Sequence, residues 1–152
     1  MMSICQFYFI GINNDYSFTQ ILKLAIKVNN NTIQTMTLQS NLQHIVTAAE
    51  YQKTIEENEN VMICCGRMGP MCVPVYAIME DLEKSGKFDH ISFKDMLFDI
   101  PEAHVIRNMP ECAGFMGLPF TVYIKNGQVV NATSSIQNLD QIMTILEKDL
   151  PK

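Results

Sequence analysis

Three of the five cysteines in this chain lie close together, and their spacing predicts sulfur chemistry. Cys64 and Cys65 are adjacent at the end of an apolar run, and Cys72 follows the short segment GRMGPM. A cysteine in the first turn of a helix is favoured as the thiolate, because the helix dipole and free N–H groups stabilise negative charge. The thiolate is the nucleophilic form of cysteine, so the cluster predicts thiol–disulfide exchange.

The residues around these cysteines predict a strand, a loop and a helix, in that order. Val61–Cys65 is fully apolar, as in a strand that is buried on both faces of a sheet. Pro70 suits the first position of a helix, which is predicted to end near Ser85 with Gly86 as its stop signal. Pro74 falls in the second turn of this predicted helix, where the missing N–H predicts a kink or a strained first turn.

The rest of the chain predicts further strands and helices in alternation. Thr47 and Glu50 form a capping-box signal, and Asn126-Gly127 predicts a tight hairpin turn. Strands are expected over 42–46, 91–100, 119–125 and 128–132, and helices over 47–57, 101–108 and 138–150. The order β-α-β-α-β-α-β-β-α predicts an α/β domain whose first half contains a right-handed crossover.

Residues 1–38 are predicted to be an N-terminal extension, followed by a domain over 39–152. Within the extension, residues 4–12 are read as a short strand and residues 17–28 as an apolar helix. No chemistry is assigned to the extension, and Cys5 is given no role.

Composition limits the classes of function. The chain has 152 residues, a net charge of −5, and 47% apolar and 18% charged residues, as expected for one globular domain. It has no basic run and no apolar segment of about 18 residues, so neither nucleic-acid nor membrane partners are expected. Clustered cysteines in a chain of this length favour reduced thiols, and we expect a cytoplasmic monomer without a bound cofactor.

Two segments of the sequence resemble the thioredoxin family. GLPFTVYIKNGQVV (117–130) is similar to the family's Gly-Ile-Pro-Thr segment followed by Phe-Lys-Asn-Gly. VMICCGRMGPMC (61–72), which leads into Glu80-Asp81-Leu82, is the second match, and the likeness covers about residues 40–150. The resemblance implies a thioredoxin-like three-layer α/β/α fold with a central mixed sheet. It also implies that Pro119 is a cis-proline facing the active site.

The active-site motif departs from that of the family, which is Cys-Gly-Pro-Cys. Counting back from Glu80, Cys72 matches the second, resolving cysteine, and Gly69 matches the nucleophile. Aligning Gly69-Pro70 with the family's Gly-Pro places Met68 at the nucleophile instead. Neither alignment produces a C-x-x-C pair, so the dithiol mechanism carries over only in part.

The leading hypothesis is a thiol–disulfide oxidoreductase, or an electron carrier in a thiol redox chain. Cys72 and Cys65 would cycle between dithiol and disulfide, with Arg67 as a nearby cation, and the spacing leaves open which of the two attacks. The expected partners are protein disulfides and a thiol/disulfide reductase. The residues expected to contact an extended substrate are Leu118, Pro119, Gly69 and Pro70.

Several alternatives remain open at this stage. Cys64 must point away from Cys65 on a regular strand, which favours a role in the core. Either Ile63 or Cys64 stands at the position where the thioredoxin family has a buried aspartate. Cys112 is either a second resolving thiol or a simple loop cysteine, and Cys72 itself could be inert. The chain could be a non-catalytic protein-binding module, and a zinc or iron–sulfur site is a weaker alternative. The three histidines read as surface or packing residues.

Overall fold

The computed structural model describes residues 37–152, so the predicted strand and helix of the N-terminal extension, and Cys5, lie outside the described residues. The strands are β1 (Gln43–Ile45), β2 (Asn60–Gly66), β3 (Ile91–Leu97), β4 (Phe120–Lys125) and β5 (Gln128–Ser134). The helices are α2 (Ala48–Glu57), α3 (Val73–Ser85), α4 (His104–Arg107) and α5 (Leu139–Asp149). Two short 3₁₀ helices cover Pro101–Ala103 and Pro110–Cys112.

The five strands form one mixed sheet with the order β1-β3-β2-β4-β5. Strands β1, β3 and β2 are parallel to one another, whereas β4 and β5 pair in antiparallel fashion on the other side of β2. Strand β2, which carries Cys64 and Cys65, is therefore the central strand, and every residue in it is buried. The continuous apolar run of the sequence follows from this position, because both faces of the strand are covered.

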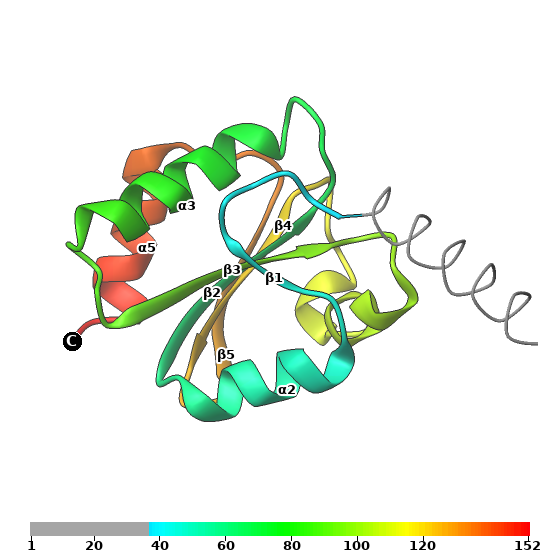
Figure 1. The fold of residues 1–152 in the computed structure, drawn as a ribbon, viewed down its shortest axis with the longest axis horizontal. Coiled ribbons are helices and arrows are strands. Elements are labelled where there is room, and N and C mark those ends of the chain that lie inside the picture. The colour runs from blue at the N-terminus through cyan, green and yellow to red at the C-terminus, as the bar shows by residue number, and fades with distance from the viewer. Residues whose placement is uncertain (1–36) are drawn as a thin grey trace, which may run out of the picture. The chain divides into compact units, whose positions relative to one another are not determined.

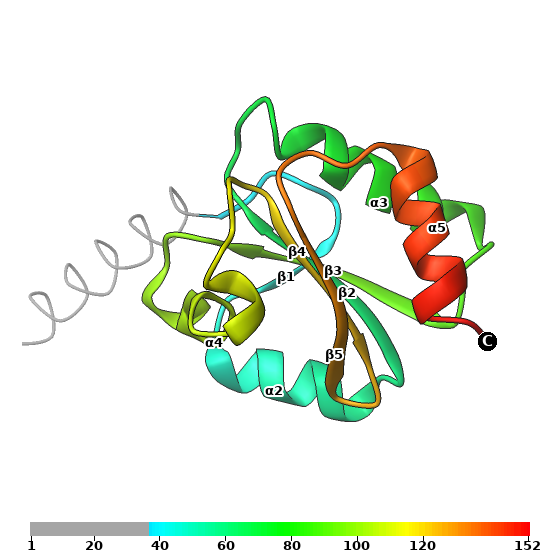
Figure 2. The same cartoon turned by 180° about the vertical axis from the view of Figure 1, so that it is seen from behind.

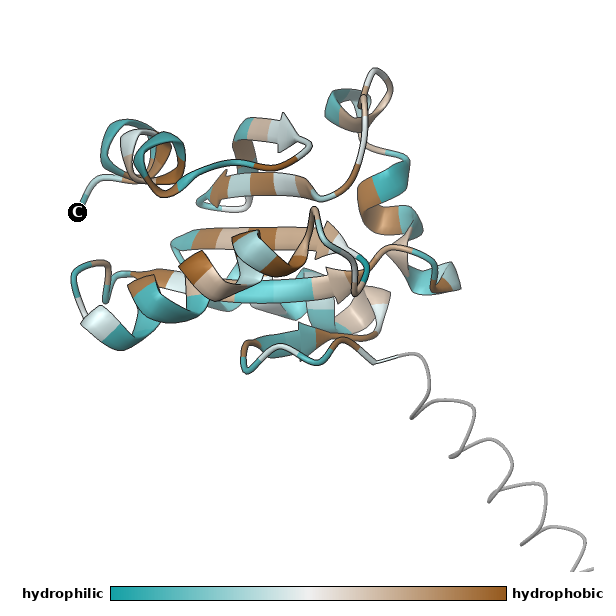
Figure 3. Ribbon diagram, turned by 90° about the horizontal axis from the view of Figure 1, so that it is seen from above, coloured by the Kyte–Doolittle hydropathy of each residue, from teal (hydrophilic) through white to brown (hydrophobic). Residues whose placement is uncertain are grey.

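Helices cover both faces of the sheet, as Figures 1 and 2 show. Helices α3 and α5 pack on one face, and we call the buried cluster beneath them the first core. Helices α2 and α4 pack on the opposite face, over the second core. Figure 3 shows the corresponding hydropathy, with apolar bands along the central strands and on parts of the helices. Within residues 37–152 no helix is long and apolar enough to cross a membrane.

Helix α3 begins later than the sequence predicts. It starts at Val73, with Cys72 as its N-cap, and residues 70–72 form a turn in which the N–H groups of Cys72 and Val73 both donate to the Gly69 carbonyl at 3.0 Å. Pro74 is then the second residue of the helix, where an N–H has no helical partner in any case. The structure thus places Pro74 in the first turn of α3 rather than in its second, and Gly86 ends the helix in the left-handed conformation, as expected.

The hairpin and proline signals are confirmed. Asn126 and Gly127 both have positive φ, 49° and 74°, and join β4 to β5 in a two-residue turn. The Leu118–Pro119 peptide bond is cis. Pro119 lies immediately before β4, so it stands at the same end of the sheet as the last residues of β2.

The capping box of helix α2 provides a first testable prediction. The Thr47 hydroxyl accepts the Glu50 N–H at 3.1 Å, and a Glu50 carboxylate oxygen accepts the Thr47 N–H at 3.2 Å. Thr47→Ala should lower the free energy of unfolding by about 1 kcal/mol, because the cap of the helix is lost. Thr54→Ala is the matched control: its hydroxyl donates to the Glu50 carbonyl within the helix, so we expect a change within about 0.5 kcal/mol. Urea unfolding of both variants measures the difference, and equal stabilities would contradict the capping role.

Candidate functional site

Cys72 lies where strand β2, its following loop and helix α3 meet. As the N-cap residue it stands at the positive end of a 13-residue helix, and its sulfur accepts the backbone N–H of Arg67 at 3.5 Å. In general, a helix N-terminus and an N–H donor are the two kinds of group that favour a thiolate. The Arg67 guanidinium, expected to act as a nearby cation, instead binds the Asp99 carboxylate through two hydrogen bonds of 2.6 and 2.7 Å. The helix end and the Arg67 N–H are therefore the groups that act directly on this thiol.

The alternation of strand β2 decides which neighbouring thiol shares a face with Cys72. Cys64 points into the first core, where Cys72 also lies, whereas Cys65 points into the second core on the opposite face of the sheet. The expected pair of Cys65 and Cys72 therefore does not share a core, which corrects the geometry assumed from the spacing. All three cysteines are free thiols in this structure.

Gly66 leaves the space that the Cys72 side chain occupies. It follows Cys65 on β2, so it faces the first core, and a Cβ atom at this position would lie 2.9 Å from the Cys72 sulfur. The same added atom would lie 2.6 Å from the Tyr76 hydroxyl oxygen. A glycine at this position thus allows Cys72 and Tyr76 to pack directly over the end of the strand that carries Cys64.

A row of buried polar side chains crosses the first face of the sheet beneath helix α3. Asp95 on β3, Cys64 on β2 and Thr121 on β4 are register partners, and each is at most 1% exposed. Tyr76 on α3 packs in the same core, and its hydroxyl has no hydrogen-bond partner within residues 37–152. Burial is the main reason that the pKa values of Cys64 and Tyr76 are raised, and neighbouring thiols and Asp95 add to the effect. Cys64 is therefore held as the neutral thiol.

Asp95 connects this row to the solvent. Its carboxylate accepts hydrogen bonds from the Ser40 hydroxyl and from His44 Nδ1, the latter at 2.6 Å. The Asp95 side chain is fully buried, whereas that of His44 is 31% exposed. Burial raises the pKa of Asp95, and the hydrogen bonds from Ser40 and His44 oppose this effect in part.

Sequence reasoning missed this cluster, and it read His44 as a surface or packing residue. The available signal was a lone aspartate inside the apolar strand segment ISFKDML, at a position that shares a face with Ile91 and Phe93. A charged residue at such a position is rarely buried without a partner.

Cys65 and Cys112 form a second group of thiols on the opposite face. Both are buried in the second core, and they are at most 4% exposed. Burial raises the pKa of Cys65 to about 12, with Cys112 as the next cause, and burial also raises the pKa of Cys112. Arg107 lowers both values slightly, but its guanidinium is bound to the carbonyls of Phe98 and Ile100. Because Cys65 and Cys112 belong to the second core and Cys72 to the first, these two thiols lie on the opposite face of the sheet from Cys72.

Exposed apolar side chains occur on the loops at the end of the sheet where β2 ends and β4 begins. Because Cys65 pairs with Phe120 in antiparallel register, the loop after Gly66 starts next to the end of the loop before Pro119, and Figures 1 and 2 show the two loops leading from there to α3 and back to α4. We call the exposed apolar residues on these two loops and at the start of α3 the apolar patch: Met68, Met71, Val73, Phe115 and Met116. Gly69, Pro70 and Leu118, expected to bind substrate, lie on the same two loops.

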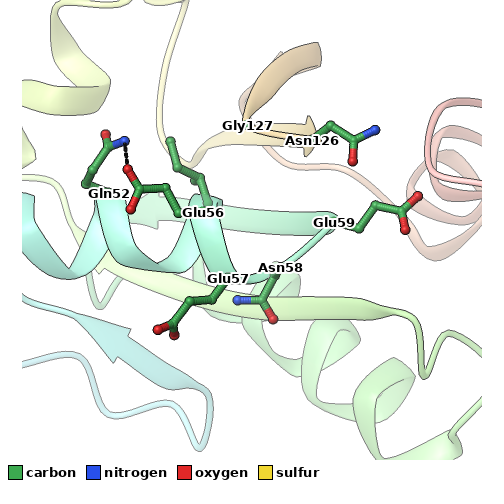
Figure 4. Close-up of a pocket in the computed structure, with 8 residues that line it drawn as sticks. Gln52, Glu56, Glu57, Asn58, Glu59, Asn126 and Gly127 are labelled. Atoms are coloured by element: carbon green, nitrogen blue, oxygen red, sulfur yellow. Dashed lines mark hydrogen bonds between the residues drawn. The ribbon is translucent and has the colours of Figure 1, made fainter.

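A hollow in the described part of the chain lies away from the cysteines. It has a volume of about 480 Å³ and lies around the end of α2 and the β4–β5 turn, and Figure 4 shows its lining residues, among them Glu56, which accepts a hydrogen bond from Gln52. Asn60 pairs with Lys125 at this end of the sheet, whereas the cysteines lie at the other end. The hollow therefore does not contact the thiols. Within residues 37–152 no group of three or more His, Cys, Asp or Glu side chains is placed to hold a metal ion.

Comparison with known proteins identifies the fold. No protein-family model and no curated protein matches the sequence. Among solved structures, thioredoxin from Plasmodium falciparum is similar over 70% of this chain and 98% of its own, with a TM-score of 0.58 and 21% identity. Thioredoxin from Malassezia sympodialis matches 74% of this chain and 93% of its own, with a TM-score of 0.58 and 14% identity. Thioredoxin f2 from Chlamydomonas reinhardtii covers 74% and 99%, with a TM-score of 0.56 and 11% identity.

The chain therefore has a thioredoxin-like fold, as its cis-proline and mixed sheet predict. At identities of 11–21% the likeness concerns the arrangement of the backbone. What the chain does must be argued from its own residues.

Proposed function

We propose that the chain is a thioredoxin-fold redox protein that exchanges its Cys72 thiol with disulfides of partner proteins. The observation that carries this proposal is the placement of Cys72, at the N-terminus of α3 with the Arg67 N–H directed to its sulfur. The apolar patch and the cis-proline loop around Pro119 border this helix end, and an extended segment of a partner would dock there. Free thiols throughout residues 37–152 suit a reducing compartment such as the cytoplasm.

Cys64 is the partner thiol that the packing favours, in place of Cys65. In the proposed cycle the Cys72 thiolate attacks one sulfur of a partner disulfide, and the other partner sulfur leaves as a thiolate that takes up a proton. Cys64 then attacks the Cys72 sulfur of this mixed disulfide, and the second partner sulfur leaves and takes up the proton that Cys64 gives up. The partner ends reduced, the chain holds a Cys64–Cys72 disulfide, and a thiol/disulfide reductase returns it to the dithiol. Because Cys72 is only 3% exposed, the loop over residues 67–71 must open for the first attack.

A second candidate, a protein-docking module without catalysis, is favoured by the distribution of exposed sulfur. The four cysteines within residues 37–152 are at most 4% exposed, whereas the methionines on either side of Gly69-Pro70, Met68 and Met71, are 44% and 45% exposed. A partner that docks on the apolar patch therefore first meets thioethers rather than thiols. Thioether side chains are adaptable contact residues, but they do not carry out disulfide exchange.

Single cysteine variants test the exchange reaction. Wild-type protein is titrated with a glutathione redox couple, and its disulfides are mapped by mass spectrometry alongside an insulin-reduction assay. We expect Cys72→Ser to lose exchange, Cys64→Ser to accumulate a mixed disulfide at Cys72, and Cys65→Ser to keep the activity. If Cys65→Ser loses activity and Cys64→Ser keeps it, Cys65 rather than Cys64 is the partner thiol of Cys72. If the wild type forms no disulfide with Cys72 and does not reduce insulin, catalysis is excluded.

A binding assay tests the docking candidate separately. The probe is the isolated B chain of insulin with its cysteines carboxymethylated, which is an extended peptide that cannot exchange disulfides. Binding that is equal for the wild type and Cys72→Ser, without insulin reduction, would establish docking as the function. The absence of any binding would exclude it.

A further inference from the structure

A buried tyrosine, Tyr76, lies beside Cys72 at the start of helix α3. It follows Cys72 by four residues, and its N–H donates to the Cys72 carbonyl at 3.1 Å, so the two side chains are neighbours on one face of the helix. Side chains on a helix lean toward its N-terminus, which directs the Tyr76 ring toward the turn that holds Cys72. Both residues are packed in the first core, and Tyr76 is only 2% exposed.

The Tyr76 hydroxyl and the Cys72 sulfur lie around one point, next to Gly66. A Cβ atom at Gly66 would be 2.6 Å from the hydroxyl oxygen and 2.9 Å from the sulfur, so both atoms fill the space that a side chain would take here. The hydroxyl has no hydrogen-bond partner in the part of the chain that the structure describes. A buried hydroxyl without a partner is costly, and its hydrogen is free to rotate toward a new acceptor.

The phenol of Tyr76 keeps its proton, so it remains a hydrogen-bond donor. Burial raises its pKa, and Cys64, Cys72, Asp95 and Cys65 raise it further because each of them becomes negative when it ionises. These four neighbours lie on β2, on β3 and at the start of α3, and all of them are acids. None of them can therefore supply a positive charge to sulfur in place of the hydroxyl.

The acceptor that suits this hydroxyl is the thiolate of Cys72. Burial raises the pKa of the Cys64 thiol, so Cys64 stays neutral, and a neutral thiol is only a weak acceptor. Cys72 is the attacking sulfur of the proposed exchange, and it already accepts the Arg67 N–H at 3.5 Å. A hydrogen bond to an ionised group is about twice as strong as one between neutral groups, so the hydroxyl gains most when Cys72 ionises.

We propose that the Tyr76 hydroxyl is a catalytic hydrogen-bond donor, which turns to the Cys72 sulfur when that sulfur becomes a thiolate. The phenol O–H bond stays intact throughout, and the proton of Cys72 passes to a base in solution before the attack. The hydrogen bond increases the fraction of thiolate, but it lowers the nucleophilicity of each thiolate. The catalytic role rests on the exchange proposed above, whereas the hydrogen bond itself does not.

Alkylation of Cys72 at different pH values tests the hydrogen bond without any disulfide exchange. Full-length wild type and Tyr76→Phe receive short pulses of iodoacetamide between about pH 5 and about pH 10.5, which brackets ordinary cysteine ionisation, and peptide mass spectrometry reports the rate at Cys72. We expect the midpoint of the profile to rise by about one pH unit in the variant. The variant should react about threefold more slowly below both midpoints and about threefold faster above them.

This crossover separates a hydrogen bond from a change in packing, because a more open loop would speed alkylation by the same factor at every pH. Tyr76→Phe should fold, since it removes only an unpartnered hydroxyl. Tyr123→Phe is the matched control: Tyr123 is also buried in the first core, and its hydroxyl also has no partner within residues 37–152, but it lies on β4, where it pairs with Met62. Its alkylation profile should equal that of the wild type.

Three results would overturn the proposed hydrogen bond. They are a profile of Tyr76→Phe that equals that of the wild type, a change by one factor at every pH, and an equal shift of the midpoint in Tyr123→Phe.

Insulin reduction then tests the catalytic role. If the wild type reduces insulin, Tyr76→Phe should do so about threefold more slowly at neutral pH, and Tyr123→Phe should keep the wild-type rate. Equal rates for the wild type and Tyr76→Phe would overturn the catalytic role. If the wild type does not reduce insulin, the exchange function and the catalytic role both fail, while the alkylation profiles still decide whether the hydrogen bond exists.

Discussion

Gly66→Ala is expected to lower the free energy of unfolding by about 1–3 kcal/mol, although it adds a single methyl group. The added Cβ would lie 2.6 Å from the Tyr76 hydroxyl oxygen and 2.9 Å from the Cys72 sulfur. Neither neighbour can move freely, because Tyr76 and Cys72 are 2% and 3% exposed and both are packed in the first core. Urea unfolding monitored by circular dichroism measures the loss, and a stability equal to that of the wild type would show that this close packing is absent in solution.

Two further variants isolate the cause of this loss. Gly69→Ala is the matched control on the same loop, since no atom lies within 4 Å of the position of its Cβ, and we expect a change within about 0.5 kcal/mol. Tyr76→Phe removes the hydroxyl that would lie closest to the new methyl group. The double variant Gly66→Ala/Tyr76→Phe should therefore regain part of the stability lost in Gly66→Ala, with a coupling energy of about 0.5–3 kcal/mol. Purely additive effects would exclude the clash with Tyr76.

Local signals predicted the framework that surrounds the site. The capping box at Thr47, the hairpin at Asn126-Gly127 and the stop at Gly86 depend on neighbouring residues alone, and each occurs where the sequence places it. The start of α3 was predicted three residues too early, because Pro70 suits a turn as well as a helix N-terminus. The carbonyl of Gly69, the residue before Pro70, accepts the N–H groups of the turn that precedes the helix. Helix propensities do not predict these hydrogen bonds.

The grouping of the cysteines required tertiary structure. Alternation along a strand predicts that Cys64 and Cys65 point to opposite faces, but it does not say which face α3 covers. Helix α3 covers the face of Cys64, so Cys72 shares a core with Cys64 rather than with Cys65. Asp95 was missed for the same reason, since its partners Ser40 and His44 are 55 and 51 residues away in sequence.

Asp95→Asn is expected to become more stable relative to the wild type as the pH rises above about 4. Burial raises the pKa of Asp95 in the folded protein, so the folded state binds a proton more tightly than the unfolded chain does. The wild type therefore loses stability as the pH rises from the unfolded value, about 3.9, through the raised folded value, and the loss is about 1.4 kcal/mol for each pH unit between them. Asparagine carries no charge, so the variant avoids this loss while keeping a similar shape.

Urea unfolding of both proteins across this pH range measures the difference, and Asp99→Asn is the control. Arg67 lowers the pKa of Asp99, so the stability that this carboxylate contributes is present above about pH 4 and is lost only as the pH falls. The difference in free energy of unfolding between Asp99→Asn and the wild type should therefore stay constant in the pH range where the difference for Asp95→Asn increases. A constant difference for Asp95→Asn as well would mean that Ser40 and His44 fully stabilise the buried carboxylate. Asp95 would then carry its negative charge next to Cys64 above about pH 4, which would oppose ionisation of that thiol throughout this range.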